Sequence, residues 1–383
     1  MKGNITRRGK SSWRLKFDLG PDPVTGERKI AYKTVRGTKR EAQTALALAI
    51  AERESGEWIE PSVLTVQAYL EKWLADHSKV TVSAKTFERY ADLVNHHLVP
   101  RLGAHRLQRL TPLHIQGAYA DMLASGRRDG KGGLSARTVH HAHRVLFAAL
   151  RQAVRWQLLS RNPAEGVTAP KPDKPEIPIL DNAGMGELLK AALGTRLYLP
   201  TLIATTTGLR RGEVLGLRWK DVEIERSQLT VTQKLEETKA GLAFKAPKTE
   251  GSRRTVKLPS ITVQALRQHK KAQAEDRLRL GLGRDDVGLV FTRIDGTPVR
   301  PRQLSQEFAR LAKSAGLKVS YHGLRHSHLT ALMASGVNPK VICERAGHAS
   351  VATTLDLYGH VMPGMQEEVA QGVDAAIRTA LEH

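Results

Sequence analysis

The stretch from Tyr321 to His360 decides how the rest of the chain is interpreted, and it reads YHGLRHSHLTALMASGVNPKVICERAGHASVATTLDLYGH. Apolar residues recur at helical spacing from about residue 322 to residue 335, which predicts a helix. Gly336 ends that helix. The pair Asn338-Pro339 starts a second one, because Asn is a good N-cap and Pro suits the first helical position. Gly347 fits the left-handed cap at the second helix's end.

Four polar side chains of this stretch are expected to surround one ligand. His322 and Arg325 stand three positions apart on the first helix, so they share a face and can reach the same group. His348 falls just outside the end of the second helix. Ser350 can cap a third short helix, which carries Tyr358.

Simpler explanations exist for each of these residues. A single Tyr on a helix is usually part of a core, and a single His is usually structural or solvated. His322 and His326 could also face a zinc ion as two ligands on one helix. No Glu follows His322, however, and no nearby cysteine pair or carboxylate completes a ligand set. We therefore expect neither a metal nor a cofactor.

The charge balance predicts a polyanionic partner. The 383 residues, of which 40% are hydrophobic, suggest two or three domains with real cores. The 60 Lys and Arg against 38 Asp and Glu give a net charge of +22, which points to nucleic acid. An anionic membrane surface is the competing partner, but no apolar run approaches the ~20 residues that span a bilayer.

The expected location is the reducing environment of the cytosol. The first residues are charged and lack the apolar stretch of a secretory signal. Cys343 is the only cysteine, so no intrachain disulfide can form, which fits a reducing compartment.

Residues 1–57 predict a small module with a three-stranded sheet and a helix. Apolar residues alternate with charged ones in the main strand, at Trp13, Leu15, Phe17 and Leu19. A shorter strand is expected before it, and the segment KIAYKTV is a third. Thr38 and Glu41 form a capping box that opens a helix to about residue 54. Basic side chains on the outer face of the sheet suit DNA contact, and the candidates are Arg14, Lys16 and Lys33.

Residues 62–160 predict an all-helical domain. The expected helices cover about residues 66–75, 86–98, 112–124 and 136–158. Pro100 is expected to break the second, while Thr111 and Ser135 cap the third and fourth. Several helices carry arginines that would make a DNA clamp, and the candidates are Arg89 and Arg144.

Residues 161–180 contain five prolines, which predicts a semi-extended linker without regular structure. The remaining residues, 181–383, predict a mainly helical domain with a small antiparallel sheet. Gly208 makes a turn and Arg210 opens a short helix, on which Glu213 can support a guanidinium. The segment QLTVTQKLE predicts one strand, and GLAFKAPKTEGSRRTVKLP predicts strand, turn and strand, with Lys248 at the turn's edge.

Five segments together resemble the tyrosine recombinase (phage integrase) family. They are TGLRRGE at 207–213, PKTEGSRR at 247–254, HGLRH at 322–326, AGH at 346–348 and the segment around Tyr358. No single motif is strong, but five in the right order and spacing are hard to obtain by chance. Ala346 departs from the Leu that the family often has before Gly-His, at a position expected to serve packing.

The resemblance implies a domain order and a set of roles. Residues 1–57 correspond to an arm-type DNA-binding module, as in integrases of temperate phages and conjugative transposons. Residues 62–160 correspond to a SAM-like core-binding domain and residues 181–383 to the catalytic domain. The implied catalytic residues are Arg210, Lys248, His322, Arg325, His348 and the nucleophile Tyr358, with Glu213 in support.

The chemistry of phosphodiester exchange suits these residue types. Two arginines offer planar, permanently charged forks for the non-bridging oxygens of a phosphate. A tyrosine with a pKa of ~10 needs a partner that takes its proton, for which His322 is the candidate. Lys248 would protonate the departing 5′-hydroxyl. The product would be a 3′-phosphotyrosine, and neither ATP nor a metal is needed in principle.

The leading hypothesis is therefore a site-specific recombinase that integrates or excises a mobile element. The alternatives are a type IB-like topoisomerase, a DNA-binding regulator without catalysis and, last, a metal hydrolase. The expected partners are double-stranded DNA with specific attachment sites, copies of the same chain in a tetramer on DNA, and accessory proteins for bending or directionality.

Overall fold

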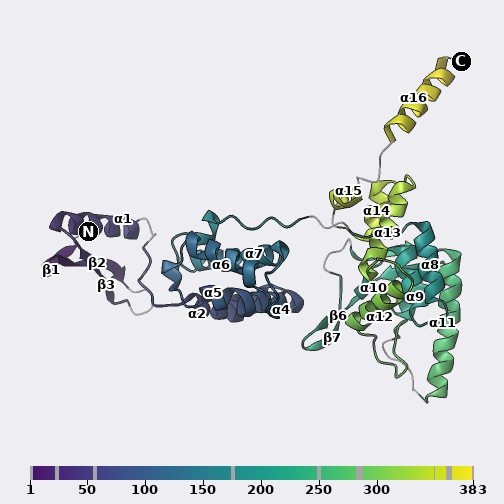
Figure 1. Ribbon diagram of the computed structural model, residues 1–383, viewed down its shortest axis with the longest axis horizontal. Coiled ribbons are helices and arrows are strands. Elements are labelled where there is room, and N and C mark those ends of the chain that lie inside the picture. The colour runs from purple at the N-terminus through teal and green to yellow at the C-terminus, as the bar shows by residue number, and fades with distance from the viewer. Residues whose placement is uncertain are drawn as a thin grey trace. The chain divides into compact units, whose positions relative to one another are not determined.

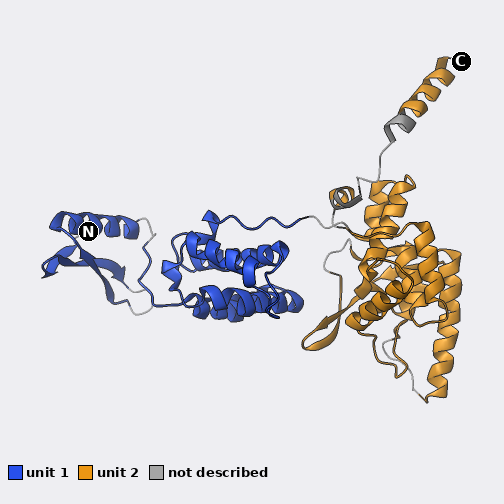
Figure 2. Ribbon diagram, viewed as in Figure 1, with its two compact units in different colours: residues 1–174 blue, residues 175–383 orange. Residues whose placement is uncertain are grey.

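The computed structural model describes residues 3–21, 26–54, 58–173, 177–247, 252–281, 288–348, 350–358 and 365–381. The chain divides into two compact units, residues 1–174 and 175–383, and the boundary falls inside the proline-rich segment (Figure 2). The first unit contains two separate cores, one in the N-terminal module and one in the helical domain. No helix in the described ranges is both long and apolar enough to cross a membrane.

The N-terminal module is the expected sheet with one covering helix (Figure 1). Its antiparallel strands pair in the order β1-β2-β3, and the helix follows them. The elements are β1 (Asn4–Gly9), β2 (Ser12–Pro21), β3 (Arg28–Arg36) and α1 (Lys39–Glu54). Leu15 and Phe17 of β2 are buried under Leu46 of α1, which confirms the alternating pattern. The backbone N–H of Thr38 donates to Glu41 and that of Glu41 donates to Thr38, so the capping box forms.

The strand register assigns each basic candidate of this module to a face. Residues directly opposite each other in an antiparallel pair project from the same side of the sheet. Lys16 pairs with Tyr32, and Arg14 pairs with Thr34. Both alternate with the buried Leu15 and therefore lie on the face that α1 does not cover. Lys33 pairs with the buried Leu15 and therefore lies on the helix side.

The helical domain has the expected four-helix content with two wider, π-type turns. Its elements are α2 (Val66–Lys72), η1 (Trp73–Ser78), α3 (Lys79–Thr81), α4 (Ala84–Leu93), η2 (Val94–Leu98), α5 (Val99–Leu102), η3 (Leu107–Arg109), α6 (Pro112–Ser125) and α7 (Ala136–Arg155). The side chains of Thr111 and Ser135 accept from backbone N–H groups of α6 and α7, so both predicted caps are confirmed. The core is formed by Tyr69, Leu98, Tyr119 and Leu146, all fully buried.

The predicted break at Pro100 is wrong, because helical turns continue through it to Leu102. The N–H of Val99 bonds to the carbonyl of Val94, five residues back. A proline ring in a regular helix meets the carbonyl four residues back. The wider turn before Pro100 changes that spacing, which lets the chain accommodate the ring without ending the helix.

The start of the proline-rich segment is also more ordered than expected. Residues Pro163–Gly166 form the 3-10 turn η4, capped by the side chain of Asn162. Ala164 is buried in the core of the helical domain. The first part of the segment thus belongs to that domain, because an apolar side chain among the prolines packs against it.

The second unit surrounds one large core with helices and two small sheets. Its helices before residue 321 are α8 (Asn182–Ala192), α9 (Tyr198–Thr207), α10 (Arg211–Leu215), η5 (Trp219–Asp221), α11 (Ser260–Arg279) and α12 (Pro301–Ser314). Its strands are β4 (Val222–Glu223), β5 (Gln228–Val231), β6 (Lys234–Thr238), β7 (Gly241–Lys245) and β8 (Arg254–Lys257). The sheets have the orders β4-β5-β8 and β6-β7.

The pairing of these strands corrects two predictions. The single strand expected over QLTVTQKLE is two strands, β5 and β6, in different sheets. Between them the side chain of Gln233 donates to the carbonyl of Gly216 at 2.8 Å, which turns the chain. The strands on either side of Lys248, β7 and β8, pair with β6 and β5 rather than with each other.

The stretch from residue 321 onward forms the predicted series of helices. They are α13 (Tyr321–Ala334), α14 (Pro339–Ala346), α15 (Val351–Tyr358) and α16 (Met365–Leu381). The side chain of Asn338 caps α14, which ends at Gly347 in the left-handed conformation with φ 63°. Gly336 also has a positive φ, of 72°, after α13. Both glycines therefore occupy the positions that the sequence predicted.

We predict that Leu15→Ala selectively unfolds the N-terminal module. Removing a fully buried leucine costs about 2–5 kcal/mol, which is a large share of what so small a core can supply. Hydrogen exchange of β2 should lose its protection, while that of α6 and α7 should not change. Leu48→Ala on the exposed face of α1 is the matched control. Equal loss of protection in both variants would contradict the assignment of this core.

Candidate active site

The site begins at the turn between α9 and α10, which presents Arg210. Gly208 ends α9 with φ 67°, and a Cβ there would lie 2.8 Å from the ring of His328. Arg210 follows as the N-cap of α10 in an extended conformation. Its backbone N–H and its Nη1 donate to the two oxygens of Glu213, each at 2.9 Å. Glu213 therefore accepts from both the backbone and the guanidinium of Arg210.

Arg325 reaches the same place from α13. Its side chain is buried, and the residue is only 3% exposed. Nη1 donates to the carbonyl of Gly208 at 2.6 Å and Nη2 donates to the carbonyl of Ala346 at 2.7 Å. One guanidinium therefore joins the turn after α9 to the end of α14, which are far apart in the sequence.

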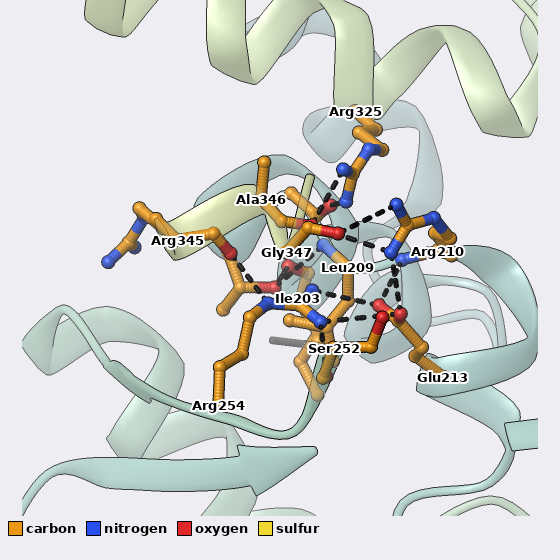
Figure 3. A network of polar contacts seen from close by, with 12 residues as sticks. Ile203, Leu209, Arg210, Glu213, Ser252, Arg254, Arg325, Arg345, Ala346 and Gly347 are labelled. Atoms are coloured by element: carbon orange, nitrogen blue, oxygen red, sulfur yellow. Dashed lines mark hydrogen bonds and ion pairs between the residues drawn. The ribbon is translucent and has the colours of Figure 1, made fainter. Parts of the chain in front are cut away.

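The two arginines converge on one stretch of backbone (Figure 3). Arg210 donates through Nη2 to the carbonyl of Gly347 at 3.1 Å and, more weakly, through Nη1 to that of Ala346 at 3.5 Å. Arg325 donates to the same Ala346 carbonyl. The Arg210 side chain is still 38% exposed, so its guanidinium can meet a ligand from solvent.

His348 stands beside this pair. The left-handed Gly347 turns the chain out of α14, so that His348 is half-buried next to the arginines. Its Nδ1 lies 2.8 Å from the hydroxyl of the buried Thr354 on α15, which leaves Nε2 to meet a ligand. Burial, together with the positive charges of Arg325 and Arg210, lowers the pKa of His348 to about 4. The imidazole is therefore neutral at pH 7 and can act as a hydrogen-bond donor.

His322 and His326 lie one turn apart on α13 with their rings perpendicular, at a centroid distance of 5.0 Å. His322 keeps contact with solvent, but the protein atoms around its ring and the charges of Arg325 and Arg210 lower its pKa. Burial lowers the pKa of His326 to about 4. Within the described ranges, no three His, Cys, Asp or Glu side chains gather as metal ligands would.

Two of the expected catalytic side chains lie outside what the structure describes. Lys248 lies outside the described residues, in the connection between β7 and β8. Tyr358 is the last residue of α15, and its side chain also lies outside what is described. The helix that carries it packs against α13 and α14, beside the arginines.

A second tyrosine in this stretch, Tyr321, has a structural role. Tyr321 is buried, and its hydroxyl donates to the carbonyl of Pro200 at 2.7 Å. Burial raises the pKa of this phenol far above its usual range. A hydroxyl that is bonded and shielded from water in this way is a poor candidate for a nucleophile.

Sequence reasoning missed two arginines that hold the site together. Arg254, at the start of β8, donates through Nε to the carbonyl of Arg345 at 2.7 Å and through Nη2 to Glu213 at 2.8 Å. Arg345 donates to the carbonyl of Thr206 at 2.7 Å and to Nε2 of His328 at 3.2 Å. The only sequence signal is their position, Arg254 as the last residue of PKTEGSRR and Arg345 directly before AGH.

The resulting network is strongly cationic. The guanidiniums of Arg210 and Arg254 bind the carboxylate of Glu213, and that of Arg325 meets Arg210 at the Ala346 carbonyl (Figure 3). Burial opposes ionisation of Glu213, but the bonds and charges of Arg254 and Arg210 outweigh it and lower the pKa of the carboxyl. Such a cluster is complementary to a group with one negative charge and two oxygens that accept hydrogen bonds, such as a phosphodiester.

The basic candidates of the helical domain also come together. Arg89 on α4 and Arg144 on α7 are both exposed. The pKa of His141 is lowered by burial and then by the charges of these two arginines, so both guanidiniums lie near one imidazole. The pair forms a basic spot on this domain.

Comparison with known proteins identifies the class. Residues 179–364 match the phage integrase family, and residues 65–123 match the N-terminal SAM-like domain of phage integrases. The chain belongs to the tyrosine recombinase (phage integrase) family, and it is a tyrosine-type, site-specific recombinase that exchanges DNA strands. The fold class predicted from the sequence is confirmed.

Individual relatives cover nearly the whole chain. A tyrosine recombinase XerC-like protein of Caldanaerobacter subterraneus is 26% identical over 94% of this chain and 95% of its own. The Tn1549 transposon integrase, solved with transposon right end DNA, has a TM-score of 0.68 at 22% identity, over 82% of this chain and 99% of that one. A lambda integrase tetramer bound to a Holliday junction has a TM-score of 0.56 at 18% identity, over 92% of this chain and 94% of that one.

We predict that acid destabilises the second unit through its buried histidines. His328 accepts from Arg345 and so must be neutral, and burial and Arg345 lower its pKa to about 4. Protons bind the unfolded chain first as pH falls from about 6.5, so the free energy of unfolding decreases down to about pH 4. His328→Gln keeps an acceptor without titrating, and should flatten this slope by up to about 1.4 kcal/mol per pH unit.

The measurement uses Cys343, which is buried in this unit and is the only cysteine of the chain. The full chain is equilibrated in urea at pH 7.5 to 5, and the thiol is then labelled in a short pulse at one fixed pH. Identical slopes for the original chain and His328→Gln would contradict the prediction.

Proposed function

We propose that the chain integrates or excises a mobile element by forming a 3′-phosphotyrosine bond between Tyr358 and DNA. The observation that carries the proposal is the convergence of Arg210 and Arg325 on the Ala346 carbonyl, with His348 beside them. Arginines this close can bind the non-bridging oxygens of one phosphate as two forks. Preorganised donors of this kind supply the largest part of many rate enhancements, because they need not reorganise as charge develops.

The reaction we propose is a balanced transesterification. The Tyr358 oxygen attacks the phosphorus, and its proton passes to His322, which is neutral at pH 7 and can accept it. The bond from phosphorus to the 5′-oxygen breaks, and Lys248 gives that oxygen a proton. A 5′-hydroxyl of another strand then reverses the step, so no external energy source is consumed. His348 would donate to a non-bridging oxygen through Nε2.

The modules suggest how DNA is held. In this proposal, residues 1–57 bind arm-type sites, residues 62–160 bind core sites and residues 181–383 cut and join the strands. Arg14 and Lys16 would face DNA from the uncovered side of the sheet, where the Arg14 guanidinium lies 4.2 Å from the ring centroid of Tyr32. Arg89 and Arg144 would do so from the helical domain. The net charge of +22 favours binding to many phosphates along the DNA backbone.

Assembly as a tetramer on DNA is a further part of the proposal. Helix α16 has an apolar stripe, Val373, Ile377 and Leu381, at four-residue spacing, and these residues are exposed. Such a stripe gains stability when it packs on a surface. We propose that it packs on a second copy of the chain, and that accessory proteins for bending and direction act in the bacterial cytoplasm.

We predict that DNA becomes covalently bound to Tyr358 without metal. The probe is a duplex that the full chain selects from a randomised library, remade with single nicks at successive positions so that cleavage releases a short strand. In EDTA the original chain should form an adduct, and peptide mapping should find DNA on Tyr358. Tyr358→Phe should form none, whereas Tyr321→Phe should still form it.

Other outcomes distinguish the alternatives. An adduct that survives Tyr358→Phe contradicts the proposed nucleophile. Cleavage that appears only after a divalent metal is added indicates a hydrolase. Relaxation of supercoiled plasmids that lack the selected duplex indicates a topoisomerase.

We predict that Arg14→Ala weakens DNA binding more than Lys33→Ala. Both remove one positive charge from the same small sheet, but the two residues lie on opposite faces. If the uncovered face contacts DNA, Arg14→Ala should lower the slope of log K against log salt by about 1, and Lys33→Ala should leave it unchanged. Fluorescence anisotropy with the selected duplexes measures both. Equal effects would argue against this face.

A further inference from the structure

Arg254 makes several buried contacts, and the proposed reaction assigns it no role. Its side chain is 6% exposed. It makes four hydrogen bonds with three partners. Two go to the carboxylate of Glu213, at 3.3 and 2.8 Å, one goes to the carbonyl of Arg345 at 2.7 Å, and one goes to that of Ser252 at 3.2 Å. A buried guanidinium bound on several sides is rigid, because any other rotamer would leave these acceptors unpaired.

The first of these partners connects Arg254 to Arg210. Each oxygen of Glu213 accepts one bond from Arg254 and one from Arg210. The carboxylate is therefore shared, and Arg254 fixes the orientation in which it meets Arg210. If Arg254 were absent, the Glu213 carboxylate would lose two of its four hydrogen bonds and would no longer be held in the orientation that supports Arg210.

The second partner connects Arg254 to the corner that carries His348. Its bond to the Arg345 carbonyl holds the last turn of α14. A Cβ on Gly347 would lie 2.9 Å from Nη1 of Arg254, so the guanidinium fills the space beneath the left-handed glycine. Arg254 thus supports, at once, the carboxylate behind Arg210 and the backbone that presents His348.

We propose that Arg254 is a positioning residue for strand cleavage, which it serves by holding Glu213 and the Gly347–His348 corner in the geometry that binds the scissile phosphate. This inference rests on the proposed function. Arg254 also lies at the chain's return from the Lys248 segment, since β8 begins with it. Arg254 therefore connects the start of β8, where the Lys248 segment ends, to the site formed by Arg210 and Arg325.

The role predicts a loss of rate without a matching loss of affinity. In Arg254→Met the side chain keeps much of its bulk but none of its donors. At saturating protein and pH 7.5, adduct formation with the nicked selected duplex should slow by about 100-fold, as small misplacements of catalytic groups do. The dissociation constant for the uncut duplex should change by less than about threefold, because Arg254 is too buried to meet DNA. Arg254→Lys, which keeps the charge and one donor, should recover part of the rate.

A pH profile separates positioning from a purely structural role. With Arg254 gone, burial and the loss of its charge should raise the pKa of Glu213, so the carboxyl gains a proton as pH falls and stops accepting from Arg210. The rate of Arg254→Met, relative to the original chain, should therefore fall further between pH 7.5 and 5.5. The double variant Arg254→Met, Glu213→Gln should lose this extra pH dependence.

The outcomes are distinguishable. If the original chain forms no adduct, the proposed function fails. If it does and Arg254→Met matches its rate, the inference fails. It also fails if the loss in Arg254→Met is constant across pH, or follows the fraction of unfolded chain seen by thermal melting. Arg226→Met, which removes an exposed arginine paired with Glu223, is the control for a change in net charge.

Discussion

The second unit depends on one buried carboxylate that serves two guanidiniums. Glu213 accepts four hydrogen bonds, two from Arg210 and two from Arg254, while its side chain is 7% exposed. Removing one partner of a buried ion pair typically costs about 3–5 kcal/mol, because the remaining charge is left without compensation. The arrangement is stable only if all three side chains are present together. It ties α10, β8 and the end of α14 to a single point.

The same sharing leaves the cluster with more positive than negative charge. One carboxylate cannot neutralise both of its guanidiniums, and Arg325 meets backbone carbonyls at Gly208 and Ala346. Carbonyl dipoles orient a guanidinium without cancelling its charge. A phosphodiester can therefore supply the missing negative charge. The histidines around the cluster stay neutral as well, since burial and then the nearby arginines lower the pKa of His322 and His348.

Local patterns predicted most elements, because each depends on neighbours in the sequence. The caps at Thr38, Thr111 and Asn338 and the left-handed turn at Gly347 follow from short-range hydrogen bonds and backbone sterics. The failures have causes that the pattern of residue types does not show. The helix continues through Pro100 because a π-type turn forms before it.

The pairing of the strands and the face of the sheet on which a side chain lies could not be predicted from the sequence, for a related reason. The division of QLTVTQKLE follows from pairing with different partners, since β5 pairs with β8 and β6 pairs with β7. Lys33 was grouped with Arg14 by charge, but only the register showed that they lie on opposite faces. The sequence by itself determined the order of the helices and which residue types could bind a phosphate, since composition, spacing and capping are local properties. Only the tertiary structure decided that Arg254 and Arg345 hold those residues together, because hydrogen bonds between segments about 40 to 140 positions apart leave no pattern in a single chain.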